Sequence, residues 1–306
     1  MPIKLILDTD IGTDVDDAWA LALCLASPEI ELLGVTLVHA DLETRAKVAL
    51  KMLKLAGRTD IPVYKGISNP LTEGLGVYWH GHEGTDTDFA DIAGLAARDG
   101  AIDFIIDTIR RHPGEIVLAS IGPMTNVGAA IRRDCAAMRH VKRLCVMGCT
   151  YEGEGREKAA PEHNIHWDPI AAKIALESGI PARVVGLNVT GKVVIRRDDL
   201  KPIKDTPFGG YLSAMTEQFF GIAGRDYTFM HDPLAIATEI DRSVVTTRKM
   251  TAEVLDAGRV AFTSTPPSPP YQGGASGGVE VCVDVNVSKF ENLLRSRVRS
   301  LSTKGE

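Results

Sequence analysis

Short apolar segments alternate with longer segments of mixed polarity along most of the chain. The apolar segments have the length and near-continuous hydrophobicity of strands that are buried on both faces. They lie at Lys4–Leu7, Leu32–Val38, Ile116–Ser120, Val141–Met147 and Arg183–Leu187. The predicted helices between them include Asp16–Ala26, Glu43–Ala56, Ala101–Arg111, Asn126–Arg132 and Pro169–Ser178. This alternation predicts an α/β fold, in which an open, mostly parallel sheet carries helices on both faces.

The C-terminal part of the chain has a different pattern. Residues 264–278 are rich in proline and glycine, so we expect a surface loop there. This loop separates Val260–Phe262 from Val279–Val285, which we predict to be two strands paired with each other. No internal repeat and no convincing domain boundary is visible, so we expect a single domain over residues 1–306.

The composition excludes several classes of protein. A net charge of −6 and a pI near 5.8 argue against a nucleic-acid partner bound through a basic surface. The five cysteines are few and lie mostly in apolar segments, so we expect them to be reduced. Neither a signal peptide nor an apolar run of membrane-spanning length is visible. We therefore expect a cytoplasmic protein that does not contact a membrane.

The stretch from Asp8 to Ala18 carries the strongest chemical signal. It follows the first predicted strand directly, and its five aspartates are Asp8, Asp10, Asp14, Asp16 and Asp17. Such a cluster repels itself unless a cation is bound, and hard cations such as Ca²⁺ and Mg²⁺ prefer oxygen ligands. The alternative, an acidic helix N-terminus favoured by the helix macrodipole, explains one or two of these acids but not five. We therefore predict a metal site at this strand end, where parallel sheets bind their ligands.

Three further clusters contain candidate functional groups. Gly122–Asn126 is a strand-to-helix turn whose carbonyls can face a metal, although it also fits an ordinary helix start. Glu162 and Asn164 are two residues apart, so in an extended chain both side chains point the same way and can bind neighbouring sugar hydroxyls. Simple surface exposure is the alternative for this pair. His231 precedes Asp232, and a structural His–Asp pair is the commoner explanation of such a dipeptide.

Together these motifs resemble the nucleoside hydrolase family of the inosine–uridine preferring type. The resemblance runs from the first strand to about Phe290. It is based on the Asp-Thr-Asp-Ile-Gly opening with Asp-Asp-Ala, then Gly-Pro-Met-Thr-Asn, Glu-x-Asn followed by Asp-Pro, and His-Asp-Pro-Leu-Ala. It implies a Rossmann-like nucleoside hydrolase fold and a Ca²⁺ cofactor. The implied reaction is hydrolysis of the N-glycosidic bond of ribonucleosides to ribose and free base, in purine or pyrimidine salvage, by a homodimer or homotetramer.

The resemblance also implies roles for individual residues. The Ca²⁺ ligands would be Asp10, Asp17, the carbonyl oxygen of Thr125, and Asp232. Asp10 would also be the general base that takes a proton from the bound water, and His231 would protonate the leaving base. The substrate would be bound by Asp16, Asp41, His80 (or its rival His82), Glu162 and Asn164.

The chain departs from the usual pattern of the family at four places. Its opening is two residues longer, which makes Asp14 an extra carboxylate and a rival to Asp16 for the role of second acid. Ala40-Asp41 stands where the family usually has Gly-Asn, Arg156 stands at a usual asparagine, and His163 replaces an aromatic residue. These changes keep the implied metal ligands and leave the sugar and base preference open.

Three alternatives compete with this interpretation. A Mg²⁺-dependent phosphatase of the haloacid-dehalogenase type would use Asp8 as nucleophile and Asp10 as acid, but its later lysine and second acidic pair have no clear candidate. An EF-hand loop is excluded because its twelfth position, counted from Asp8, is Trp19 instead of a bidentate glutamate. The third alternative is a catalytically inactive nucleoside-binding relative. The joint presence of four residues argues against it: Asp10, Asp17, Asp232 and His231.

Overall fold

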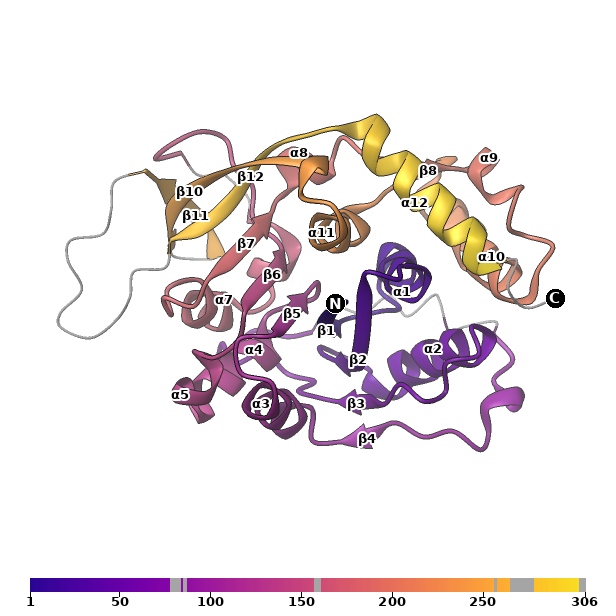
Figure 1. The fold of residues 1–306 in the computed structure, drawn as a ribbon, viewed down its shortest axis with the longest axis horizontal. Coiled ribbons are helices and arrows are strands. Elements are labelled where there is room, and N and C mark those ends of the chain that lie inside the picture. The colour runs from indigo at the N-terminus through magenta and orange to yellow at the C-terminus, as the bar shows by residue number, and fades with distance from the viewer. Residues whose placement is uncertain (78–83, 85–86, 157–160, 256–257, 265–277, 303–306) are drawn as a thin grey trace.

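The computed structural model describes residues 1–77, 84, 87–156, 161–255, 258–264 and 278–302. Its main strands are β1 (Ile3–Thr9), β2 (Ile30–Leu37), β3 (Val63–Lys65), β4 (Arg98–Asp99), β5 (Ile116–Ser120), β6 (Arg143–Met147), β7 (Ala182–Val185), β10 (Val245–Val254), β11 (Val260–Thr263) and β12 (Val279–Val285). Among the described residues they form one ten-stranded sheet in the order β11-β10-β12-β7-β6-β5-β1-β2-β3-β4 (Figure 1). A separate antiparallel pair consists of β8 (Val194–Arg196) and β9 (Tyr227–Phe229).

Neighbouring strands from β4 across to β12 all run parallel. The five strands predicted from apolar runs are found as β1, β2, β5, β6 and β7, with ends shifted by at most a few residues. These strands lie in the middle of the sheet and are almost entirely buried, which is why their hydrophobicity is continuous and does not alternate.

The pairing predicted near the C-terminus is wrong. Val260–Phe262 and Val279–Val285 are both in strands, β11 and β12, but they do not pair with each other. β10 lies between them and is antiparallel to both. The sequence of β10, Val-Thr-Thr-Arg-Lys-Met-Thr-Ala-Glu-Val, is polar and only partly buried, so it lacks the apolar run by which the other strands were recognised. The predicted loop at 264–278 lies almost entirely outside the described residues.

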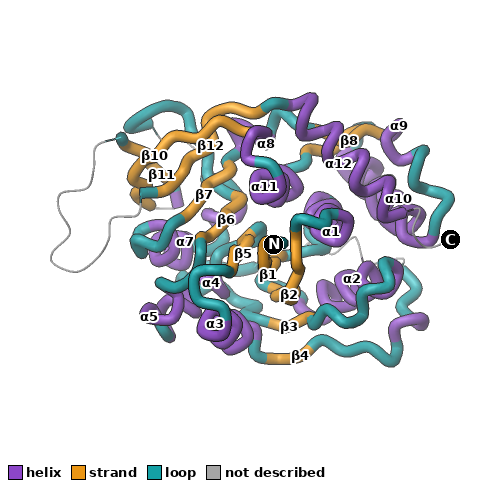
Figure 2. The backbone as a smooth tube through the Cα atoms, in the orientation of Figure 1, coloured by secondary structure: helices purple, strands orange, loops and turns teal. Residues whose placement is uncertain are grey.

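Helices cover both faces of the sheet (Figure 2). On the face that Leu5 and Leu7 of β1 point to, the helices are α1 (Asp16–Ala26), α2 (Leu42–Leu55), α10 (Pro207–Ala223), α11 (His231–Ile240) and α12 (Val287–Ser302). On the face that Ile6 points to, they are α3 (Ala101–Arg111), α4 (Thr125–Arg133), α5 (Cys135–Met138) and α7 (Pro169–Leu176). The shorter helices are α6 (His163–His166), α8 (Leu187–Thr190), α9 (Arg197–Leu200), η2 (Ala90–Ile92) and η3 (Arg242–Val244).

The connection from β1 to α1 positions the acidic cluster. β1 lies between β5 and β2, and its carboxyl end leads through residues 10–15 directly into α1. Every residue of α1 except Leu25 is buried, because this helix lies between the sheet and the helices α11 and α12. The Trp19 indole also donates a hydrogen bond to Thr216 Oγ1 on α10, at 3.0 Å. The first turn of α1 is therefore fixed deep inside the molecule.

Two expectations from composition can be compared with the structure. All five cysteines lie within the described ranges and are free thiols, as expected. None of the helices described is both long and apolar enough to span a bilayer.

Candidate functional site

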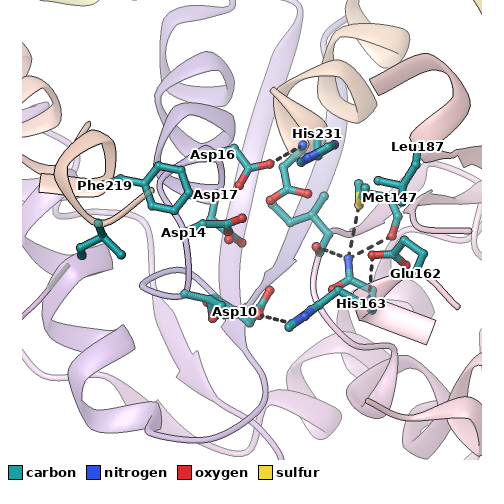
Figure 3. Close-up of a pocket in the computed structure, with 15 residues that line it drawn as sticks. Asp10, Asp14, Asp16, Asp17, Met147, Glu162, His163, Leu187, Phe219 and His231 are labelled. Atoms are coloured by element: carbon teal, nitrogen blue, oxygen red, sulfur yellow. Dashed lines mark hydrogen bonds and ion pairs between the residues drawn. The ribbon is translucent and has the colours of Figure 1, made fainter. Parts of the chain in front are cut away.

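A cavity of about 340 Å³ opens at the carboxyl ends of the central strands (Figure 3). The sheet supplies Asp10, Ile121 and Met147, which follow or end β1, β5 and β6. The other residues of the wall are Thr13, Asp14, Asp16, Asp17, Glu162, His163, Asn164, Leu187, Phe219, Ile222, His231 and Asp232. Segments between positions 10 and 232 thus meet at the carboxyl ends of the strands, where parallel sheets bind their ligands.

One side of the cavity is a cluster of carboxylates. Asp14, Asp16 and Asp17 each offer an oxygen within 4.8 Å of the others. Asp232 joins them from the start of α11, where its backbone N–H donates to Asp16 Oδ2 at 3.1 Å. Burial raises the pKa of all four carboxyls, and the neighbouring negative charges raise the pKa of Asp14, Asp17 and Asp232 further. The cluster is an all-oxygen, mutually repelling set of the kind that a divalent cation stabilises.

Asp10 lies on the floor of the cavity, slightly apart from this cluster. Thr13 Oγ1 lies 3.1 Å from Asp10 Oδ2 and donates to it. The Arg45 guanidinium and His163 Nε2 approach the same carboxylate oxygen at 3.9 and 4.0 Å. A Cβ atom on Gly122 would lie 2.6 Å from Asp10 Oδ1. The turn after β5 therefore needs a glycine for Asp10 to occupy this place.

The opposite side of the cavity carries Glu162 (Figure 3). Asn164, two residues further along the chain, also lines the cavity. Glu162 is the N-cap of α6, and its carboxylate accepts hydrogen bonds from the backbone N–H groups of Asn164 at 2.9 Å and of Cys149 at 3.2 Å. Asn164 Nδ2 donates to the carbonyls of Ile121 at 2.7 Å and Met147 at 3.2 Å. Burial raises the pKa of Glu162 to about 7. Both side chains are held rigidly against the cavity.

Two histidines also line the cavity. His231 begins α11, and its Nδ1 lies 2.7 Å from Thr190 Oγ1. Burial lowers the pKa of His231 to about 4, so its imidazole is neutral at pH 7. His163 Nδ1 accepts a hydrogen bond from the Trp167 indole at 3.2 Å. A neutral His163 ring therefore carries its proton on Nε2, the atom nearest to Asp10.

The model of one protein family matches residues 5–292, and that family is described as inosine–uridine preferring nucleoside hydrolase. The chain belongs to this family. Its sheet with helices on both faces is the nucleoside hydrolase fold, so the predicted fold class and family are confirmed. The family also makes the chain a ribonucleoside hydrolase, which confirms the predicted reaction class and rejects the phosphatase alternative.

Similar proteins support this assignment over almost the whole chain. The chain is 31% identical to the pyrimidine-specific ribonucleoside hydrolase RihA of Salmonella typhi, over 98% of this chain and 99% of that protein. It is 30% identical to uridine nucleosidase 1 of Arabidopsis thaliana, over 80% of this chain and 76% of that protein. The solved structure of a purine-preferring ribonucleoside hydrolase from Gardnerella vaginalis has a TM-score of 0.85 at 31% identity, covering 98% of this chain and 99% of that one.

The structure of this nucleoside hydrolase brings most of the predicted site residues together. Asp10, Asp16, Asp17, Glu162, Asn164, His231 and Asp232 all line the cavity, and so does the extra acid Asp14. Glu162 and Asn164 do so from a helix start, not from the extended chain on which their pairing was argued. An acidic residue at the N-cap position accepts the unpaired N–H groups of the first helical turn, which is why the chain coils there.

Two predicted residues lie elsewhere. Asp41 does not line the cavity and instead caps α2, where its carboxylate accepts from the N–H groups of Glu43 and Thr44 at 3.1 Å. Thr125 begins α4 outside the cavity wall, and its hydroxyl donates to Asp168 at 2.8 Å. The residue of that turn that does reach the cavity is Ile121.

Other positions were also named from the sequence. His80 and its rival His82 lie outside the described residues. Arg156 is exposed and does not line the cavity. Asp8, the nucleophile of the phosphatase alternative, also lies outside the wall, and its Oδ1 accepts from Thr36 at 2.6 Å and Asn126 at 2.7 Å.

Several contributors to the site were missed in the sequence. Phe219 and Ile222 line the cavity from the C-terminal part of α10, and Ile222 is 57% exposed. A large apolar side chain on an exposed helix face is a weak signal of a binding surface. Asp168 accepts hydrogen bonds from several segments behind the site; its motif was noticed, but its structural role was not. Arg45 carries no sequence signal, because a basic residue in a helix is usually solvated.

Proposed function

We propose that this nucleoside hydrolase uses a bound Ca²⁺ and the acids of the cavity to hydrolyse the N-glycosidic bond of ribonucleosides. The proposal is based on the two kinds of side chain that face each other across the cavity. A cluster of buried carboxylates faces Glu162 and Asn164 across one cavity at the end of the sheet. The first group suits a hard cation, and the second offers an acceptor and an amide to sugar hydroxyls.

The residues present fit a divalent cation. The donor set is made of carboxylates from Asp10, Asp17 and Asp232 together with a backbone carbonyl, and it contains no soft ligand. We assign the carbonyl to Ile121, because Ile121 lines the cavity and Thr125 does not. Burial and the neighbouring carboxylates raise the pKa of Asp17 and Asp232, and a bound cation would offset both effects, which supports the proposal.

In this proposal different side chains of the cavity have different roles in the reaction. A bound Ca²⁺ supplies a Lewis acid that orients the ribose hydroxyls and lowers the pKa of water beside it. Asp10 accepts the proton of the attacking water. Asp16, Glu162 and Asn164 bind the ribose hydroxyls. The negative carboxylates stabilise the positive charge that builds on the ribose as the bond to the base breaks, as carboxylates do in glycoside hydrolysis.

His231 is the proposed partner of the departing base. Its imidazole is neutral near pH 7, and Thr190 contacts one ring nitrogen. The other ring nitrogen, Nε2, donates a hydrogen bond to the leaving base in this proposal. This bond strengthens as negative charge builds on the base. The Phe229 ring lies beside His231, with 5.5 Å between the two ring centroids.

The test is release of reducing sugar from a panel that includes inosine and uridine, with and without chelator. We expect sugar release that is lost on chelation and restored by Ca²⁺, and we expect Asp232→Ala to lose both metal and activity. Full turnover by a preparation verified as metal-free would contradict the role of the cation. Nucleoside binding in calorimetry without any sugar release would support the inactive relative. The predicted homodimer or homotetramer and cytoplasmic location stay predictions, the first of which light scattering can check.

A further inference from the structure

Arg45 is a fully buried cation next to the proposed general base. The side chain projects from α2 and is 0% exposed. Its guanidinium donates to the carbonyls of His39 at 2.7 Å and Ile11 at 2.9 Å, and to Thr13 Oγ1 at 3.0 Å. Buried arginines are rare unless their charge and donors are satisfied. Here three of the donors bond to backbone carbonyls from two loops and to one hydroxyl.

These contacts join two of the places where the sequence departs from the usual family pattern. Ile11 and Thr13 belong to the opening that is two residues longer than usual. His39 directly precedes the second departure, Ala40-Asp41, and both His39 and Ala40 have positive φ angles, 66° and 56°. Residues other than glycine rarely adopt this conformation, so it persists only where neighbours hold it. The Arg45 guanidinium lies between the two loops and bonds to both.

Thr13 links the Arg45 guanidinium to Asp10 through two hydrogen bonds. Its hydroxyl oxygen accepts from Arg45, so its single proton is available for another acceptor. The acceptors within reach are Asp10 Oδ2 at 3.1 Å and the Asp10 carbonyl at 3.2 Å. Arg45 Nη2 itself is 3.9 Å from Asp10 Oδ2, too far for a direct hydrogen bond. The hydrogen-bonded route from guanidinium to carboxylate therefore runs through the Thr13 hydroxyl, beside the longer direct ion pair.

We propose that Arg45 is a positioning residue that fixes the carboxylate of Asp10 through the hydroxyl of Thr13. This inference rests on the proposed function, in which Asp10 is the general base and a metal ligand. A general base contributes only when its oxygen is held at the correct place, and a small misplacement costs much of the rate. The longer opening then has a structural purpose, since it brings a hydroxyl between Arg45 and Asp10.

The test compares Thr13→Val, which removes the hydroxyl but keeps the shape, with Thr13→Ser, which keeps the hydroxyl. We expect T13V to lower kcat by about 10- to 100-fold while KM stays within about threefold. T13S should recover most of the lost kcat. Calorimetry on the metal-free protein gives a second readout, in which T13V should weaken Ca²⁺ binding about tenfold and T13S should not.

The chain offers a matched control at a distance from the cavity. Thr238 is likewise buried, accepts from the buried Arg183 at 3.3 Å, and donates to the Ala235 carbonyl at 2.8 Å. Thr238→Val removes an equivalent hydroxyl outside the cavity wall, so we expect it to leave kcat within about twofold.

Arg45→Met tests the other end of the route. If both residues act through one path, R45M in the T13V background should lower kcat by less than about threefold further. Additive losses, or equal kcat and Ca²⁺ affinity for T13V, T13S and T238V, would overturn the inference. If R45M does not fold, the two Thr13 variants still decide. A wild-type protein that hydrolyses no nucleoside would instead refute the proposed function, and the calorimetric comparison would still test the positioning of Asp10.

Discussion

Replacing Asp168 with alanine should destabilise the protein more than any other loss of a single helix cap. Asp168 is fully buried at the start of α7, just behind the cavity. Its carboxylate accepts from the backbone N–H groups of Leu71 at 2.7 Å, Thr72 at 3.2 Å and Ala171 at 3.2 Å. It also accepts from the hydroxyls of Thr72 and Thr125, both at 2.8 Å. One side chain thus ties a loop and two helices together.

The size of the effect follows from these five donors. Two of these hydrogen bonds are buried and three are partly buried. A donor left without an acceptor costs about 1 kcal/mol, which gives about 5 kcal/mol if no water replaces the carboxylate. Because alanine leaves a space that water can partly fill, we expect a loss of about 3–5 kcal/mol in the free energy of unfolding. That is a large share of the about 5–15 kcal/mol that stabilises a typical domain.

Urea denaturation at a fixed Ca²⁺ concentration measures this loss, since a bound metal changes the apparent stability. The control is Asp134→Ala, which removes a partly exposed cap of α5 that accepts from the Ala137 N–H at 2.9 Å. We expect about 1 kcal/mol for this cap. If D168A costs no more than D134A, the argument from buried donors is wrong.

Three further predictions concern the reaction. Asp10→Asn should keep the fold and lower kcat by about 10²–10⁴-fold in a reducing-sugar assay; a rate within about threefold of wild type would move the role of base to Asp14 or Asp16. His231→Ala should slow hydrolysis of ordinary nucleosides but spare p-nitrophenyl riboside, whose leaving group departs as a stable anion and depends little on a hydrogen bond from His231; equal losses on both substrates would mean that His231 positions the sugar. The pKa of Glu162, raised to about 7 by burial, predicts that kcat/KM falls as the pH drops below 7, because protonation removes the charged acceptor for a ribose hydroxyl. The Glu162→Gln variant should lose this step in the pH profile, and an unchanged profile would assign the step to another group.

The sequence predicted the centre of the fold better than its edge. Strands such as β5, Ile116–Ser120, are buried on both faces, so their apolar run alone identifies them. β10, which lies next to the edge strand β11, is partly exposed and polar, and its place between β11 and β12 depends on register, which no local pattern encodes.

In the candidate site too, residues with a local sequence signal were predicted, and residues whose role depends on distant segments were not. Asp16, Asp17 and Asp232 were found because acids at strand ends and helix starts leave a local signal. An aspartate such as Asp41 suits both a helix cap and a substrate-binding position. The sequence alone does not distinguish the two, and the fold places Asp41 at the start of α2. Arg45 was missed because its partners, Ile11 and His39, lie far from it in sequence and offer only backbone carbonyls.

The burial of α1 bears on how this site can be altered. Asp16 and Asp17 are part of the first turn of a helix that is enclosed on almost every side, so the spacing of their backbones is set by packing and not by the ion. Asp14 precedes that helix and is only half-buried. Attempts to retune the site toward a smaller or larger cation should therefore begin with the length and sequence of the segment around Asp14. Changes aimed at Asp16 or Asp17 would have to displace α1 from the core to move either carboxylate.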